Sequence, residues 1–215
     1  SLDVLTVSDF VASRYREYNY THRLDIYYGI ANAPDFFPPA MPRPDDGLCH
    51  FVMVARLPNI SKRLDWALEA FQALPDDIRS RSRLHLVSFI EPTDLGIDGV
   101  ICHPWLPADR IPELLRQMDA MLAISKRETF SQAIVQGMLT ALPIISGDHP
   151  VYVEKMDTGG GVVCENATQV RDAMVTLASD PELRRRMGAI GRETALARYA
   201  WDTDRFLSEY LFRGV

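Results

Sequence analysis

Short apolar runs alternate along the chain with stretches of helical periodicity. The apolar runs, which predict strands, cover residues 24–28, 49–55, 84–89, 99–102, 120–125, 143–146 and 161–164. The amphipathic stretches, which predict helices, cover residues 9–18, 64–74, 111–118, 130–140, 168–177, 181–198 and 203–211. This alternation is typical of βα units, and strands that are apolar throughout are expected where helices cover both faces of a parallel sheet. The sequence therefore predicts an α/β fold: a Rossmann-like, doubly wound parallel sheet flanked by helices.

The predicted elements fall into three segments. Residues 48–200 hold the αβ body, residues 1–47 hold an early strand, a helix and a connector rich in Pro and Asp, and residues 201–215 hold the last helix. The chain begins with Ser1 instead of Met, close to an expected strand at residues 4–7. We therefore expect a piece of a longer protein.

Composition narrows the classes of partner. Hydrophobic residues make up 47% of the chain, and 23 Lys and Arg against 29 Asp and Glu leave a net charge of −6. An acidic chain disfavours nucleic acid as a partner, although a few cations in a cleft can still hold an anionic ligand. The three cysteines, Cys49, Cys102 and Cys164, are widely spaced in apolar runs. This spacing fits neither a metal site nor a disulfide framework, so we expect free thiols and a cytoplasmic location.

Two cations follow the strand expected at residues 49–55. Arg56 lies at its end, and Lys62 lies in the loop before the helix that starts near Leu64. Loops at the carboxyl ends of parallel strands form the ligand edge of such a sheet, and a helix N-terminus adds donors and a positive dipole end. The pair suits a diphosphate, but two solvated cations in a polar loop explain these residues equally well.

An acidic loop follows the strand expected at residues 120–125. Glu128 lies between this strand and the next helix, where Thr129 and Gln132 have the spacing of a capping box. Gln136 lies inside the helix, and Gly137 would let it pack closely on the sheet or on a nucleotide. Glu128 is thus a candidate for contacts with sugar hydroxyls and Gln136 for contacts with a ribose. Alternatively, Glu128 only favours the helix N-terminus and Gln136 is solvated.

The ordered set of motifs resembles the C-terminal lobe of the GT-B-fold, family 4 retaining glycosyltransferases, over almost the whole chain. The matching segments are Tyr28-Gly29-Ile30 with Phe37-Pro38, Val54-Ala55-Arg56-Leu57 with Lys62, Asp119-Ala120, Glu128-Thr129-Phe130, Gln136-Gly137-Met138, Leu142-Pro143-Ile144, Glu154 with Gly160-Gly161, and Tyr199-Ala200-Trp201.

The resemblance implies a role for each matching position. The catalytic positions would be Arg56, Lys62 and Glu128, and the substrate-binding positions Thr129, Phe130, Ser131, Gln136 and Glu154. Arg56 and Lys62 would bind the donor diphosphate and stabilise the leaving group, while Glu128 would contact the donor sugar. Main-chain amides of the three residues after Glu128 would line the sugar and phosphate, and Gln136 would lie near the ribose.

Several residues depart from the family pattern. Gln136 is an amide where the family has a second acid, and it offers one acceptor oxygen instead of two. Ala55 and Ser131 stand in place of glycines, and Ala141-Leu142 replaces a smaller pair. These departures leave the identity of the donor open.

The resemblance further implies retaining transfer of a sugar from a nucleotide-diphosphate sugar to a hydroxyl, with no metal and no other cofactor, in glycan or polysaccharide assembly. A sugar or lipid-linked acceptor would bind through the N-terminal lobe, so we expect the fragment alone to bind donor without appreciable turnover. The run Arg184-Arg185-Arg186 leaves room for peripheral membrane contact.

Two other interpretations stay open. Sugar-nucleotide epimerases and phosphorylases share the shape of the lobe, although neither a cofactor lysine nor a paired histidine and carboxylate is apparent. The other interpretation is a non-catalytic interaction domain that has lost donor affinity, which Gln136 would favour. Nucleotide screening separates this last case from an enzyme, because fold alone does not determine function.

Overall fold

A computed structural model of the chain describes residues 3–28, 33–40, 45–56, 60–88 and 95–212, and the statements below concern these residues. Phe89, at the end of one expected strand, and Gly29, Ile30 and Leu57 of the family motifs lie outside the described residues.

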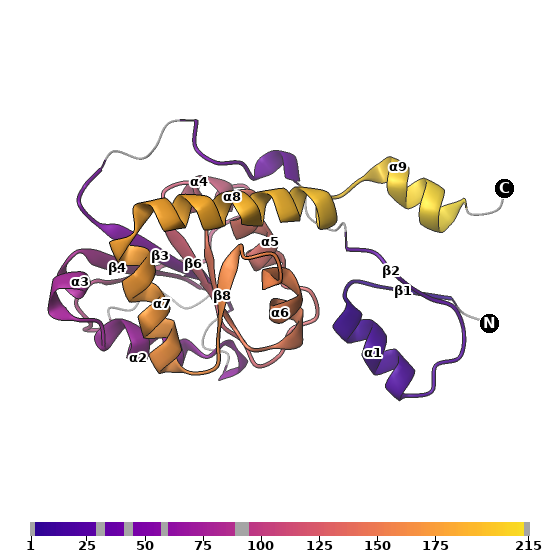
Figure 1. Ribbon diagram of the computed structural model, residues 1–215, viewed down its shortest axis with the longest axis horizontal. Helices are drawn as coiled ribbons and strands as arrows, with labels where there is room; N and C mark the ends of the chain where they lie inside the picture. The colour runs from indigo at the N-terminus through magenta and orange to yellow at the C-terminus, as the bar shows by residue number, and fades with distance from the viewer. Residues whose placement is uncertain (1–2, 29–32, 41–44, 57–59, 89–94, 213–215) are drawn as a thin grey trace.

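A six-stranded parallel sheet forms the centre of the molecule (Figure 1). Its strands are β3 (Cys49–Val54), β4 (Ser82–Val87), β5 (Val100–His103), β6 (Ala120–Ala123), β7 (Ile144–Gly147) and β8 (Gly161–Cys164). The spatial order is β5-β4-β3-β6-β7-β8, so the chain winds outward in one direction from β3 and then in the other from β6. A crevice beyond the carboxyl ends of β3 and β6 is the usual ligand position of such a sheet. The predicted Rossmann-like, doubly wound fold is confirmed.

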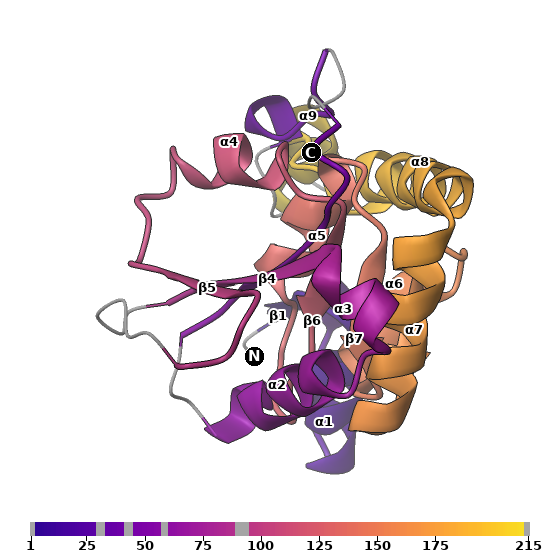
Figure 2. The same cartoon turned by 90° about the vertical axis from the view of Figure 1, so that its left-hand side faces the viewer.

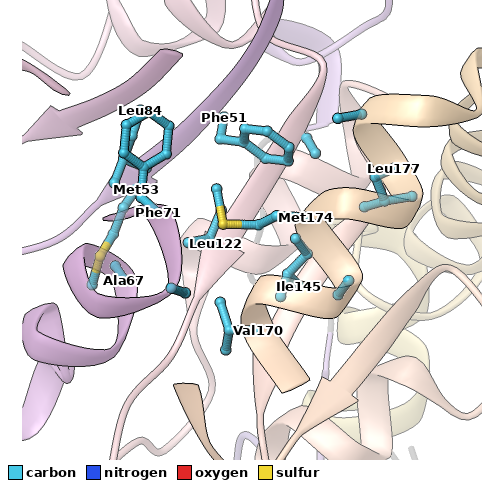
Figure 3. Close-up of a cluster of buried hydrophobic side chains, with 14 of the residues drawn as sticks. Phe51, Met53, Ala67, Phe71, Leu84, Leu122, Ile145, Val170, Met174 and Leu177 are labelled. Atoms are coloured by element: carbon cyan, nitrogen blue, oxygen red, sulfur yellow. The ribbon is translucent and has the colours of Figure 1, made fainter. Parts of the chain in front are cut away.

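Helices cover both faces of this sheet. They are α2 (Leu64–Gln72), α3 (Asp76–Ser80), α4 (Ile111–Leu115), α5 (Gln132–Leu139), α6 (Pro150–Met156), α7 (Ala167–Ser179) and α8 (Pro181–Arg198). Figure 2 shows α2 on one side of β4 and α4 on the other. Alternate residues of a strand point to opposite faces. Phe51 and Met53 accordingly pack with α2 and α7 in one core cluster (Figure 3), whereas Val52 packs with α4 and α5 in a second.

The two ends of the chain lie together beside the six-stranded unit (Figure 1). A two-stranded parallel sheet of β1 (Val4–Thr6) and β2 (Leu24–Ile26) flanks α1 (Asp9–Glu17). The last helix, α9 (Thr203–Phe206), continues as a π-helical turn (Leu207–Leu211). Tyr27 packs edge-on against Trp201, Phe206 and Tyr210, and the Tyr210 hydroxyl donates to the Ile26 carbonyl at 2.9 Å. Aromatic packing therefore holds the last helix on the first strands.

Two close approaches bring helices against the sheet and its turns. A Cβ on Gly137 would lie 2.7 Å from the Met121 sulfur of β6, so the expected packing of α5 on the sheet is confirmed. A Cβ on Gly188 of α8 would lie 1.9 Å from the Ala141 carbonyl oxygen, in the turn between α5 and β7. Gly188 is required because the backbone of another element occupies the space of a side chain, whereas a side chain at Gly137 would displace the side chains of Met121 and Ile144.

Some local predictions are wrong. The sequence did not predict α3 or α6. The expected capping box at Thr129 is absent, because α5 starts at Gln132 and its N-cap is Ser131, whose side chain makes no capping hydrogen bond. The cysteines are free, with Cys49 and Cys164 buried. Within the described residues, the helices lack the combined length and apolar character that a membrane span requires.

Candidate active site

The loops that follow β3, β6 and β7 meet at the carboxyl edge of the sheet. These strands are adjacent and parallel, so their carboxyl ends lie side by side. The Ser61 carbonyl, in the 3-10 turn Ile60–Lys62 after β3, accepts hydrogen bonds from the Lys126 amide at 2.7 Å and the Ser125 hydroxyl at 3.0 Å. The loop after β3 is thereby tied to the loop after β6.

Lys62 and Glu128, 66 residues apart in the chain, form an ion pair at this edge. The Lys62 Nζ lies 3.0 Å from Glu128 Oε2, and the two side chains are 23% and 19% exposed. The Tyr152 hydroxyl of α6 donates to the same oxygen at 3.4 Å, and burial followed by the Glu128 charge raises the pKa of this phenol. A cation, a carboxylate and a phenol are therefore held at one partly open position. The sequence predicted that Lys62 and Glu128 would share this edge, but it did not predict the phenol.

Arg63 adds a second cation that sequence reasoning overlooked. Its guanidinium donates to Asp148 after β7 at 3.0 Å and stacks on the Trp66 ring at 3.8 Å, with only 14% of the side chain exposed. The backbone of Arg63 is left-handed, with φ of 45°. Such conformations are uncommon outside glycine and need support from surrounding contacts. The Arg63–Asp148 pair links the loop before α2 to the loop after β7.

Arg56 and Gln136 lie at the predicted places along their elements. Arg56 is exposed two residues after β3, and Gln136 is partly exposed in the second turn of α5. Their assigned contacts with phosphate and ribose stay predictions. Ala55, which replaces a family glycine, does not have a positive φ, whereas Ser131 and Ala141 have φ of 65° and 62°. Glycine adopts this backbone without strain. A residue with a side chain at either of these two positions therefore strains the backbone.

The segment Thr129–Ser131 is supported from two sides. The Ser8 hydroxyl, next to α1, donates to the Thr129 carbonyl at 2.6 Å, and Phe130 as a whole residue is 3% exposed in the second core cluster. The Phe130 ring is therefore part of the core, and the predicted contact of its amide with a ligand stays a prediction.

Lys155 is a fully buried cation beside this segment. Its side chain is 0% exposed, and Nζ lies 4.3 Å from the centre of the Phe130 ring and 4.8 Å from that of Tyr199. Among the described residues Nζ has no hydrogen-bond partner. Burial lowers the pKa of Lys155 to about 8, against the opposing charges of Glu154 and Glu128.

Sequence reasoning missed Tyr152 and Lys155 because it missed α6. A signal was present: His149-Pro150 is an N-cap followed by proline at the first helical position, the same pattern as Asp180-Pro181 before α8. The His149 ring accepts from the Val151 amide at 3.3 Å, and burial lowers the pKa of this imidazole.

Glu154, assigned to substrate binding from the resemblance, lies near α1 in the structure. Burial raises the pKa of its carboxyl, the Lys155 charge opposes the rise, and the charge of Asp9 in α1 adds to it. The assignment of Glu154 to the substrate stays a prediction. Elsewhere, a cavity of about 340 Å³ lies between β8, α7 and α8, lined by residues such as Val162, Ala173 and Met187, and its lining includes no residue of the loops after β3, β6 and β7. The described residues contain no group of three His, Cys, Asp or Glu side chains arranged to hold a metal ion.

The whole arrangement offers cations and a carboxylate at the switch point of a doubly wound sheet. A model of the family described as glycosyl transferases group 1 matches residues 49–180. The chain belongs to this family. The matched range begins at β3 and ends at the N-cap of α8, so it contains the Lys62–Glu128 pair and all of α6.

The relatives agree with this membership. N-acetyl-alpha-D-glucosaminyl L-malate synthase of Bacillus anthracis is 32% identical over 107 residues, which are 47% of this chain and 27% of that protein. Sucrose-phosphate synthase from Thermosynechococcus elongatus superimposes with a TM-score of 0.78 at 17% identity, covering 92% of this chain and 54% of that chain. This group 1 chain thus spans about a quarter of the curated relative and about half of the solved enzyme.

Two further solved structures have the same fold. The C-terminal domain of a glycosyl transferase group 1 family protein (LpcC) from Francisella tularensis has a TM-score of 0.68 at 17% identity, covering 80% of this chain and 100% of that chain. HepE from Anabaena, solved in complex with UDP and glucose, has a TM-score of 0.74 at 15% identity, covering 92% and 59%. The chain therefore has the fold of a GT-B glycosyltransferase C-terminal domain.

Proposed function

We propose that this chain is the donor-binding lobe of a glycosyltransferase, which holds a nucleotide-diphosphate sugar at the loops after β3, β6 and β7 for retaining transfer to a hydroxyl. The observation that carries the proposal is the Lys62–Glu128 pair, because it joins two separate family motifs at the ligand edge of the sheet with a 3.0 Å contact.

The chemistry of the pair suits this donor. An ammonium has three donors, and Glu128 Oε2 accounts for one of them, so Lys62 can bind a phosphate oxygen while the carboxylate orients it. Arg56 supplies a second cation two residues after β3. Departure of a nucleoside diphosphate develops negative charge, and preorganised cations stabilise that charge most in a partly enclosed site. Glu128 can accept from sugar hydroxyls with the oxygen that Lys62 and Tyr152 leave open.

The remaining substrate contacts belong to the same proposal. Main-chain amides of Thr129, Phe130 and Ser131 precede α5, whose N-terminal dipole favours an anion. Gln136 would donate to or accept from a ribose hydroxyl. The HepE structure with UDP and glucose makes UDP the first nucleotide to test.

We assign the acceptor, a sugar or a lipid-linked glycan, to an N-terminal lobe, of which residues 1–47 would be the last part. The body would extend over residues 48–200 and the crossover helix over 201–215. On this division, the fragment binds donor and has negligible turnover. Free cysteines favour a cytoplasmic setting, in the assembly of glycans. Of the three arginines considered for peripheral membrane contact, Arg185 and Arg186 are exposed, whereas the Arg184 side chain is 16% exposed and lies 3.8 Å from Asp119. A peripheral membrane position would therefore depend on Arg185 and Arg186.

Nucleotide binding tests the proposal directly. We expect at least one of UDP, GDP, ADP and CDP to raise the melting temperature of the 215-residue chain, since a ligand at 100 times its Kd adds about 2.7 kcal/mol of stability. Lys62→Ala should weaken the calorimetric affinity about 10- to 100-fold, the loss of one charge-assisted hydrogen bond.

Arg185→Ala is the matched control, because Arg185 is an exposed cation paired with Glu182 on α8. Its affinity should equal that of the parent chain. Unchanged affinity in both Lys62→Ala and Arg56→Ala would remove the assignment. No stabilisation by any of the four nucleotides would instead favour a non-catalytic interaction domain.

A further inference from the structure

Lys155 occupies a position that a lysine rarely occupies. Its side chain is completely buried, and in place of a hydrogen-bonded carboxylate it meets the faces of Phe130 and Tyr199, at 4.3 Å and 4.8 Å from Nζ to the ring centres. Three ammonium donors without a hydrogen-bond partner among the described residues are costly in an apolar surrounding. Lysines are almost never fully buried unless they are paired, so a role for this charge is expected.

Helix α6 contacts the loop from Glu128 to Ser131 through two side chains of one face. Tyr152 and Lys155 are three residues apart and therefore lie together on the helix. Tyr152 donates to Glu128 at 3.4 Å, and Lys155 lies against Phe130, two residues later in the same loop. The loop from Glu128 to Ser131 is thus held at its carboxylate by a phenol and at its aromatic ring by an ammonium.

The strength of the second contact depends on charge. An ammonium is attracted to a ring face by about 0.5–2 kcal/mol, and a neutral amine is not attracted in this way. Ser131, the next residue, has a left-handed backbone with φ of 65° that surrounding contacts must maintain. A charged Lys155 therefore stabilises a loop whose own backbone conformation is unfavourable.

We propose that Lys155 is a charge-dependent positioning residue: its ammonium fixes the loop from Glu128 to Ser131 for an anionic nucleotide, and binding of that anion is accompanied by proton uptake at Nζ. The inference rests on the proposed function, since it assumes that a nucleoside diphosphate occupies the edge beside this loop.

The neighbouring charged and titratable groups determine the direction of the effect. Glu128 on the loop and Glu154 on α6 itself favour the ammonium, but burial outweighs them and lowers the pKa of Lys155 to about 8. Tyr199, after α8, has a pKa raised to about 12 by burial and stays neutral near pH 8. Burial raises the pKa of Tyr152 and lowers that of His149, so both are neutral there as well. A bound diphosphate adds negative charge and shifts Lys155 toward its protonated form.

Calorimetry in two buffers measures this proton. The 215-residue chain is titrated at pH 8 with whichever of UDP, GDP, ADP and CDP binds it, in Tris and in HEPES, whose heats of ionisation differ. If binding raises the pKa of Lys155 from about 8 to about 9, each nucleotide brings about 0.4 proton. By linkage, the affinity should fall about sevenfold between pH 7 and pH 9.5.

Lys155→Met keeps the length of the side chain without the charge. We expect this variant to take up no proton at pH 8, to bind about tenfold more weakly than the parent at pH 7, and to equal it at pH 9.5. His149→Gln is the matched control, because His149 is a second base near Glu128 whose pKa burial lowers. It should keep the proton uptake at pH 8, and loss of uptake in this variant alone would assign the proton to His149 and overturn the inference.

The remaining outcomes separate the two proposals. Binding without proton uptake, or equal uptake in the parent and Lys155→Met, would overturn the role of Lys155 and leave the donor-binding function intact. Binding of none of the four nucleotides would overturn the proposed function and this inference with it. Because the parent chain alone yields the proton count, absence of uptake overturns the inference even if Lys155→Met does not fold.

Discussion

Replacement of Lys155 by methionine should make the folded protein more stable. The ordinary pKa of lysine, 10.5, falls to about 8 in the folded chain because burial disfavours the ammonium. At about 1.4 kcal/mol for each pH unit, this difference destabilises the fold by about 3 kcal/mol at pH 7. The rings of Phe130 and Tyr199 attract the ammonium and offset up to about 2 kcal/mol of that cost. We therefore expect Lys155→Met to raise the free energy of unfolding by about 1–3 kcal/mol at pH 7.

The pH dependence gives this prediction a distinctive sign. An unfolded lysine keeps its proton up to about pH 10.5, whereas folded Lys155 loses it above about pH 8. Between these values the unfolded chain binds more protons, so the parent protein gains stability as the pH rises. The advantage of Lys155→Met is complete below pH 8 and should shrink by about 2 kcal/mol between pH 7 and pH 9.5.

Urea denaturation followed by tryptophan fluorescence at pH 7 and pH 9.5 measures both effects. Lys126→Met is the matched control: Lys126 is exposed in the same loop region, so its substitution should change stability by less than about 0.5 kcal/mol. A Lys155→Met variant that is less stable at pH 7, or whose advantage is the same at both pH values, would refute the reasoning.

Two substitutions test the backbone and the packing, and acidification tests the buried histidines. Ala141→Gly should raise the free energy of unfolding by about 1 kcal/mol in urea titrations, because φ is 62° there, and an unchanged or lower midpoint would contradict this. Gly188→Ala should lower the free energy of unfolding by at least about 2 kcal/mol or prevent folding, since its Cβ would lie 1.9 Å from the Ala141 oxygen. Gly191→Ala on the same helix is the control, because its Cβ would meet its neighbours at 3.6 Å, and thermal melts should show that it is tolerated. Burial lowers the pKa of His103 and His149, so the unfolded chain binds more protons than the folded chain below about pH 6.5, and stability should fall on acidification. His103→Gln should reduce the fall in melting temperature between pH 7 and pH 5. A fall as large as that of the parent would exclude a contribution from His103.

Local signals were sufficient for most elements. The helix expected at residues 181–198 has the same bounds in the structure, because Asp180 caps it with a hydrogen bond to the Leu183 amide and Pro181 occupies its first position. Six apolar runs became the six strands of the sheet, with ends that match or are shifted by at most two residues. Where the pattern is short it is weaker: α3 and α6, with five and seven residues, were missed.

The candidate site was predictable in outline for a similar reason. Strand ends can be recognised along the sequence, and in a parallel sheet they share one edge. This placed Arg56, Lys62 and Glu128 at the same rim before any contact was known. It did not reveal that Lys62 would pair with Glu128 at 3.0 Å, or that Arg63 would reach Asp148, because these partners are 66 and 85 residues apart.

What the sequence determined by itself is the succession of elements, the βα class and the edge that holds the charged loops, because hydrophobic periodicity, caps and prolines act within a few residues. Only the tertiary structure decided the order of the strands, the left-handed backbone at Ser131 and Ala141, and the burial of Lys155. Residues next to Lys155 in the chain do not bury it; Phe130 and Tyr199 do, from 25 residues before and 44 residues after it in the numbering. The free energy of a buried charge depends on such distant neighbours, and they are specified only when the whole chain has packed.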